Sequence, residues 1–333
     1  MKHVFFVFSH LTFYMVHQIV KTEHINVNDC FLLFGRDYTF PENHQNDFQN
    51  FFKIPNLQRC FAGINIIKTI KNVKAFDKII DEHIDHQDFY AYIAGWTDDY
   101  SNLLVSKKNC KGYYIFEEGT GSYGHHNAKT FTGVKYWAYR LVLKNIFPRF
   151  YAIKESYHNV DYYKFKGFYA SSSRAFPEFH KFPIKVIDIP FENVDLGFEP
   201  DAVLSIDPLY RFADSEAVKD IYSHLFQYLE KKNYKLIAYK FHPFFAVRPV
   251  IKKEFSDIIH DCCTSELIEL GPNIVLENVL KTYKCDFYSS GSSVQIYGAI
   301  AGAKCYAFSS YLQKYNSEYD NSNFKDFVEE IEI

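Results

Sequence analysis

The sequence predicts an α/β fold with two doubly wound, mostly parallel sheets, each in its own domain. Short apolar or β-branched runs alternate with segments of helical spacing from Val4 to Ile146, and a second alternation begins at Ala202. Such alternation is typical of consecutive βαβ units. The 333 residues also exceed what a single hydrophobic core usually serves. We therefore predict two Rossmann-like domains, residues 1–190 and 191–333, that face one another across a cleft.

Several runs in the first half are short and apolar enough to be buried strands. They are Val4–Phe8, Cys30–Phe34, Asn65–Ile70, Phe89–Ala94 and Tyr113–Phe116. Helical spacing predicts helices at Leu11–Lys21, Phe48–Ile54, Val73–His83, Asp98–Lys107 and Trp137–Ile146. From Arg149 to Pro200 the pattern weakens, and we place the crossover between the domains there, together with the last elements of the first domain.

The second half repeats the pattern. Strands are expected at Ala202–Ile206, Tyr234–Phe241, Asn273–Leu276, Cys285–Tyr288 and Lys304–Phe308. Helices are expected at Ser215–Lys232, Glu254–Ile268, Asn278–Tyr283 and Val294–Ala303, the first of them capped by Asp214 or Ser215. The acidic tail, Ser317–Ile333, is expected to form a terminal helix or to fray.

Composition excludes several classes of protein. The formal charge of -3 gives no argument for a nucleic-acid partner. Seven cysteines are scattered, and Cys30, Cys60, Cys285 and Cys305 lie in apolar runs, which predicts buried thiols in a reducing compartment. No G-x-G-x-x-G follows the first strand, so a nicotinamide cofactor is not expected. Neither a Walker A sequence nor a G-x-S-x-G elbow occurs.

The N-terminus is expected to be a strand and a helix rather than a signal peptide. Its apolar run is interrupted by Ser9, His10, His17 and Gln18, and no small-residue cleavage site follows. No stretch has the roughly 18 uncharged apolar residues of a membrane span. We expect a cytoplasmic protein.

Metal ligands are not expected either. His83-Ile84-Asp85-His86 and His125-His126 lack a supporting pattern of cysteines or carboxylates, and Cys262-Cys263 are adjacent rather than spaced as in a zinc knuckle. The cluster of Lys68, Lys71, Lys74 and Lys78 has mixed spacing. We interpret them as a solvated face, with an anionic membrane surface as the alternative.

The chemistry is expected at three stretches that each follow a predicted strand. The first is Ser289-Ser290-Gly291-Ser292-Ser293, just before a small-residue helix. The N–H groups, hydroxyls and positive dipole end of a helix start can hold a phosphate or carboxylate. The structural alternative is an ordinary serine-rich turn with an N-cap.

The second stretch is Lys240-Phe241-His242-Pro243. Pro243 keeps His242 out of helical geometry, and strand alternation puts Lys240 and His242 on the same side. A cation beside a near-neutral proton donor suits a leaving phosphate. The alternative is a surface histidine before a turn, because the chain has fourteen histidines.

The third stretch is Glu117-Glu118-Gly119-Thr120-Gly121. Two carboxylates that are partly buried cannot both ionise cheaply, so one of them would have a raised pKa and act as a base. The alternative is a solvated acidic turn. Glu277, just past the expected strand Asn273–Leu276, could accept hydrogen bonds from ribose hydroxyls, or be an exposed residue at a helix start.

With these residues in view, the chain resembles the bacterial sialyltransferases of the two-domain GT-B type. They include the lipooligosaccharide sialyltransferases (family 52), the capsular polysialyltransferases (family 38) and the multifunctional sialyltransferases (family 80). These families carry an acidic-acidic-Gly motif in the first domain, then a His-Pro motif and a Ser-Ser motif in the second. Glu117-Glu118-Gly119, His242-Pro243 and Ser292-Ser293 match in that order.

The resemblance implies a role for each matching residue. Glu117 would be the general base toward the acceptor hydroxyl, and His242 would bind the CMP phosphate and act as general acid. Family 52 places its catalytic acid ahead of the His-Pro motif, so Asp207 and Asp214 are alternative bases, as is Glu118.

The donor site is implied in the same way. Lys240 matches a lysine of family 80, and Glu277 matches its ribose-binding glutamate. Ser292 and Ser293, with Gly291, would hold the phosphate, and Ser289-Ser290 is the second serine pair that could do so.

We therefore predict an inverting, metal-independent sialyltransferase without a cofactor. It would move sialic acid from CMP-sialic acid to a terminal galactose or sialic acid of a bacterial lipooligosaccharide or capsule. The alternatives are a transferase of another CMP-activated ulosonic acid such as Kdo, a non-catalytic nucleotide- or glycan-binding module, and an epimerase or hydrolase of the same fold. The expected partners are the CMP-sugar and an oligosaccharide or glycolipid acceptor; contact with the inner membrane and a homodimer stay open.

Overall fold

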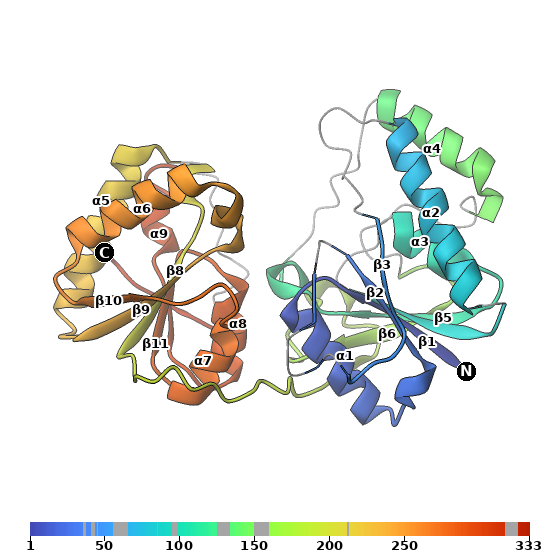
Figure 1. Ribbon diagram of the computed structural model, residues 1–333, viewed down its shortest axis with the longest axis horizontal. Helices are drawn as coiled ribbons and strands as arrows, with labels where there is room; N and C mark the ends of the chain where they lie inside the picture. The colour runs from blue at the N-terminus through green and yellow to red at the C-terminus, as the bar shows by residue number, and fades with distance from the viewer. Residues whose placement is uncertain are drawn as a thin grey trace. The chain divides into compact units, whose positions relative to one another are not determined.

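The computed structural model contains two compact units, Met1–Pro190 and Phe191–Ile333 (Figure 1). It describes residues 1–35, 38–40, 44, 46–55, 66–84, 86–94, 99–124, 134–149, 160–211, 213–316 and 326–333. Of the residues considered above, Cys60, Asn65, Asp85, Asp98, His125-His126 and Ser317 lie outside these ranges. Each unit is an α/β structure built on one sheet.

The first unit has an all-parallel sheet of seven strands in the order β3-β2-β1-β4-β5-β6-β7. The strands are β1 (Lys2–Val7), β2 (Cys30–Phe34), β3 (Phe51–Lys53), β4 (Phe89–Ala94), β5 (Cys110–Phe116), β6 (Phe165–Ala170) and β7 (Ile184–Val186). The helices are α1 (His10–Thr22), α2 (Ile66–Ile84), α3 (Asp99–Ser106) and α4 (Val134–Ile146). Every residue of β2 is buried, as expected for a strand covered on both faces.

Two predictions in this unit were wrong. The described part of the expected strand Asn65–Ile70, from Ile66 on, is the first turn of α2, because Thr69, Val73 and Phe76 are buried at helical spacing and continue the same face. The expected weak helix at Phe48–Ile54 contains the short edge strand β3, which pairs with β2. Pairing with a neighbouring strand outweighs weak local preference at such an edge.

The second unit has an all-parallel sheet of six strands in the order β10-β9-β8-β11-β12-β13. The strands are β8 (Ala202–Ile206), β9 (Leu236–Phe241), β10 (Glu266–Glu269), β11 (Asp286–Ser289), β12 (Cys305–Ala307) and β13 (Glu329–Glu330). The helices are α5 (Ser215–Glu230), α6 (Pro249–Cys262), α7 (Leu276–Tyr283), α8 (Ser293–Ile300) and α9 (Ser309–Leu312).

Here too the outer elements differ from the predictions. The expected helix Glu254–Ile268 ends at Cys262, and Glu266–Glu269 forms the edge strand β10 beside β9. No strand forms at Asn273–Leu276, since α7 begins at Leu276. The described end of the tail forms the two-residue strand β13 instead of a helix.

In each sheet, successive strands are added on one side of the first strand and then on its other side. The change of side falls between β1 and β4 in the first unit and between β8 and β11 in the second. Parallel α/β sheets bind ligands beyond the carboxyl ends of their strands, at this switch point. The three motif stretches all follow such carboxyl ends, after β5, β9 and β11.

Two expectations about the chain's environment can be compared with the structure. Cys30, Cys285 and Cys305 are buried, as their apolar neighbours predict. Within the described ranges, no helix is both long and apolar enough to cross a membrane.

Candidate active site

Glu117 is the first residue after β5, and its side chain is completely buried. Its backbone N–H donates to the carbonyl of Tyr169 at 3.0 Å, which continues the pairing of β5 with β6. The hydroxyl of Tyr123 donates to Oε2 at 2.8 Å and lies 3.2 Å from the hydroxyl of Ser171, the residue after β6. Two neighbouring strand ends thus hold this carboxyl group in place.

Burial raises the pKa of Glu117 to about 7, although hydrogen bonds from Ser171 and Tyr123 act to lower it. Its Oε1 atom accepts no hydrogen bond of normal geometry within the described part of the chain. A buried carboxyl group with a pKa near neutrality has the properties of a general base.

The two acids of the motif have different environments. Glu118 is half-buried, and its backbone N–H donates to Ser122 Oγ at 3.0 Å. Gly119 adopts a φ of 71°, which only glycine adopts without strain, and opens the 3₁₀ turn Gly119–Ser122. The raised pKa of Glu117 comes from burial, not from the repulsion between paired carboxylates that the sequence suggested.

Tyr123 and Ser171 were missed by the sequence analysis. Tyr123 follows Glu117 by six residues, within reach of a turn, so its position in the sequence was a usable signal. Ser171 offered none, because it reaches Glu117 only through the pairing of β5 with β6.

In the second unit, the first serine pair is part of the scaffold. Asp207, the residue after β8, accepts hydrogen bonds from Ser289 Oγ at 2.8 Å, from Ser290 N–H at 3.0 Å and from Ser290 Oγ at 2.7 Å. Its other oxygen accepts from Ser205 Oγ at 3.1 Å. Ser289 and Ser290 are buried, and their hydroxyls connect the two strands of the switch point.

The second serine pair lies at the start of α8. Ser292 is the N-cap and accepts from the N–H of Val294, and Ser293 is the first helical residue. The N–H groups of Gly291 and Ser292 donate to Ser289 Oγ at 3.2 and 3.0 Å. Ser292 and Ser293 are half-exposed, so they are the pair that remains accessible to a phosphate.

His242 follows β9 and is exposed. Its backbone N–H donates to Ile206 at 3.0 Å, which places it beside Asp207 at the end of β8. Its Nδ1 accepts from the N–H of Phe244 at 3.1 Å, one residue beyond Pro243, and the neutral ring therefore carries its proton on Nε2. That tautomer presents a donor rather than an acceptor at Nε2.

Lys240 and Glu277 are brought together by the fold. The ammonium group of Lys240 donates to the carbonyl of Pro272 at 3.0 Å and to that of Ile274. Burial lowers the pKa of Lys240, and its attraction to Glu277 opposes that shift. Burial raises the pKa of Glu277, which lies in the first turn of α7 rather than after a strand as expected.

Two of the alternative bases have structural roles. Asp214 caps α5 and accepts from the N–H of Ala217 at 2.9 Å. Asp207 is buried beneath the serines, where four donors already occupy it. Both carboxylates thus accept hydrogen bonds from within the second unit.

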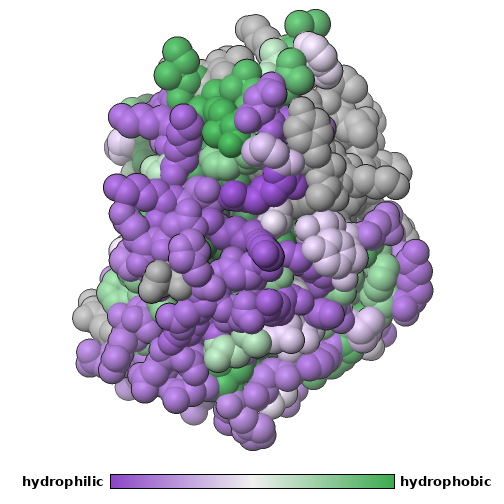
Figure 2. All heavy atoms as spheres, turned by 90° about the vertical axis from the view of Figure 1, so that its right-hand side faces the viewer, coloured by the Kyte–Doolittle hydropathy of each residue, from purple (hydrophilic) through white to green (hydrophobic). Residues whose placement is uncertain are grey.

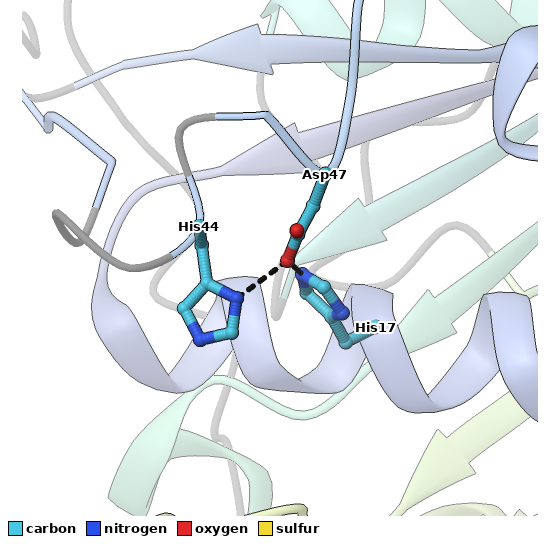
Figure 3. A group of neighbouring side chains, drawn as sticks. All are labelled: His17, His44 and Asp47. Atoms are coloured by element: carbon cyan, nitrogen blue, oxygen red, sulfur yellow. Dashed lines mark hydrogen bonds and ion pairs between the residues drawn. The ribbon is translucent and has the colours of Figure 1, made fainter.

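Among the described residues, three side chains of metal-binding type converge in the first unit (Figure 3). Asp47 Oδ2 lies 2.5 Å from His44 Nδ1 and 3.2 Å from Nε2 of His17, which lies on α1. Zinc accepts such donors. Here the three side chains pair with one another, which ties His44 and Asp47 to α1, and none of them belongs to a motif stretch.

Comparison with solved structures identifies the class of fold. The UDP-GlcNAc 2-epimerase from Methanocaldococcus jannaschii is 12% identical, with a TM-score of 0.55 over 99% of this chain and 89% of its own. The S. aureus MnaA–UDP complex is 13% identical, with a TM-score of 0.55 over 92% and 79%, respectively. The UDP-N-acetylglucosamine 2-epimerase from Rickettsia bellii is 12% identical, with a TM-score of 0.52 over 96% and 89%. These likenesses concern the fold alone and confirm the predicted class, two Rossmann-like α/β units of the GT-B type.

The family is shown by sequence. Residues 3–293 match the model of the alpha-2,8-polysialyltransferases (POLYST), and the protein belongs to this family. It is a glycosyltransferase of the sialyltransferase class, with a nucleotide-sugar donor and a glycan acceptor, as the motifs predict. A search of curated proteins gave no match.

Proposed function

We propose that the protein is an inverting, metal-independent sialyltransferase that uses CMP-sialic acid and extends a terminal sialic acid or galactose of a bacterial surface glycan. The observation that carries the proposal is Glu117, a buried carboxyl group with a pKa of about 7 after a parallel strand, in a chain of the polysialyltransferase family. The name of the family favours sialic acid over galactose as the acceptor. The donor would be held by the second unit.

The transfer would be a single displacement. Glu117 takes the proton of the acceptor hydroxyl. The hydroxyl oxygen attacks the anomeric carbon of sialic acid, and the bond from that carbon to the phosphate oxygen breaks. CMP leaves with the electron pair, and the Nε2–H of His242 and the start of α8 stabilise its charge. Because Glu117 is completely buried, binding of the acceptor has to displace part of its cover.

The other donor contacts are assigned from the motif matches. Ser292 and Ser293 would bind the phosphate, while Lys240 and Glu277 would face the nucleoside, Glu277 accepting from ribose hydroxyls. Asp207, Ser289 and Ser290 would hold the strand ends that position these groups.

The test follows CMP release from CMP-sialic acid in the presence of EDTA, without an acceptor, with lactose and with a sialylated lactose. We expect release only with an acceptor, and faster release with the sialylated one. Release that ignores the acceptor would indicate a hydrolase or epimerase. CMP binding without any release would indicate another donor such as CMP-Kdo, or a binding module.

The two serine pairs supply a matched comparison. Ser293→Ala should raise the KM for CMP-sialic acid about tenfold or more, because a hydrogen bond to a charged phosphate is lost. Ser290→Ala should instead lower the free energy of unfolding by about 2 kcal/mol, because Asp207 loses a buried donor. Urea unfolding and donor titrations measure both effects. If Ser290→Ala raises the KM and Ser293→Ala does not, the phosphate site has been assigned to the wrong pair.

A further inference from the structure

Two imidazoles and a carboxylate, from His17, His44 and Asp47, converge in the first unit (Figure 3). One ligand atom from each lies within 4.8 Å of the other two. His44 and Asp47 lie between β2 and β3, in a turn where the N–H of Asp47 donates to the carbonyl of His44 at 3.1 Å. His17 comes from α1, so the fold, and not the spacing in the sequence, completes the group.

The distances between the ligand atoms are close to those of a tetrahedral zinc site. Zinc bonds to imidazole nitrogen and carboxylate oxygen at about 2.1 Å, so two of its ligand atoms lie about 3.4 Å apart. Asp47 Oδ2 lies 3.2 Å from His17 Nε2, which fits directly, and 2.5 Å from His44 Nδ1. The second distance has to open by about 0.9 Å. The Asp47 side chain is half-exposed and has room for that movement.

Buried aromatic rings hold the two imidazoles in place. The ring of Phe13 lies edge-on at 4.6 Å from His17 and at 5.4 Å from His44, and Phe48 lies edge-on at 5.0 Å from His17. Phe13 and Phe48 are completely or almost completely buried. Rings that are already oriented lose little freedom when they bind an ion, and apolar surroundings strengthen its attraction to the carboxylate.

A surface hollow gives a hydrated ion access to the group. His17 and Asp47 line it, together with the exposed side chains of Lys21 and His24. Its volume of about 560 Å³ is ample for water molecules of about 30 Å³ each. Exposed hydrophobic side chains gather elsewhere, at the height of α2 and α4 in Figure 1 (Figure 2). A small polar occupant therefore fits the hollow better than an apolar protein surface.

We propose that His17, His44 and Asp47 bind one Zn²⁺ ion, with a water molecule from the hollow as the fourth ligand. Two imidazoles and a carboxylate suit zinc better than Mg²⁺ or Ca²⁺, which prefer sets of oxygen ligands. The ion joins α1 to the connection between β2 and the three-residue edge strand β3, and so stabilises this edge of the sheet. None of its ligands belongs to a motif stretch, and the proposal adds no step to the transfer.

The test titrates Zn²⁺ into the full chain, produced without a histidine tag and treated with a chelator that is then removed. We expect calorimetry to give one Zn²⁺ per chain with a Kd of about 1 μM or lower. Millimolar Mg²⁺ should not compete. Co²⁺ in place of Zn²⁺ should show the intense visible absorption of a tetrahedral site. Zinc should also raise the Tm, because it binds the folded state.

Variants locate the ion. His44→Gln and Asp47→Asn should each weaken zinc binding about 100-fold or more, since loss of a ligand costs at least as much as loss of a group that orients one. His180→Gln is the matched control, because His180 is an exposed histidine of the same unit outside the group. It should leave the Kd and the zinc-dependent rise in Tm unchanged. Thermal unfolding without zinc checks that each variant is folded.

Three results would overturn the proposal. They are zinc binding no tighter than about 100 μM, tight binding that persists in both His44→Gln and Asp47→Asn, and equal competition by Mg²⁺. In the first case the three side chains serve only to pair with one another, and in the second the ion binds elsewhere. Because the titration uses no sugar donor and the CMP-release test contains EDTA, failure of either test leaves the other unaffected.

Discussion

Glu117→Gln is expected to abolish transfer and, above pH 7, to stabilise the first unit. Loss of a general base lowers rates about 10²- to 10⁴-fold. The stabilisation follows from the pKa of about 7, which lies above the ordinary value of 4.5. The folded state therefore binds this proton more tightly than the unfolded state, and the resulting stability, present below pH 4.5, is lost as the pH rises through 7.

The size of this effect follows from the shift. Between low pH and pH 8, ionisation of Glu117 lowers the free energy of unfolding of the wild-type protein by about 3 kcal/mol. The Glu117→Gln variant does not have this loss, because glutamine stays neutral. Glutamine also keeps an oxygen for the hydroxyl of Tyr123. Urea unfolding at pH 5 and pH 8 should show the variant gaining stability relative to wild type only at the higher pH.

Glu118→Gln is the matched control, since Glu118 is half-buried and adjacent. It should change neither the activity nor the pH dependence of stability by a comparable amount. In the wild-type protein, kcat/KM should rise with pH through about 7 as Glu117 loses its proton. An active Glu117→Gln variant, or an inactive Glu118→Gln variant of normal stability, would assign the base elsewhere.

Asp207→Ala is expected to destabilise the second unit by about 3 kcal/mol or more. The substitution leaves Ser205, Ser289 and Ser290 with buried donors that have lost their shared acceptor, and it disconnects the ends of β8 and β11. Donor binding should weaken with it, because the turn before α8 depends on the same serines. Urea unfolding and CMP titration measure the two losses.

Asp214→Ala supplies the comparison for the other alternative base. It removes only an N-cap, which should cost about 1 kcal/mol and leave transfer intact. Asp207→Asn gives the deciding case for catalysis, since the amide keeps one acceptor oxygen. If that variant has wild-type stability and no activity, Asp207 is the base and its assignment to the scaffold is wrong.

The sequence by itself determined the two parallel sheets and the positions of the motifs at strand ends. Cys30–Phe34 is apolar throughout, and Ala202–Ile206 is apolar except for Ser205. Strands that are buried on both faces have this near-continuous apolar pattern. The position of Glu117, His242 and Ser292 after such runs follows from chain order alone.

Only the tertiary structure decided what each polar side chain contacts. Asp207 and Ser289 are 82 residues apart, and β8 must lie beside β11 before their hydrogen bond can form. Ser171 likewise lies beside Glu117 only because β5 pairs with β6. The edge strands β3 and β10 form by pairing with β2 and β9. A hydrogen bond or a pKa depends on distance and burial, and these exist only once the sheets have formed.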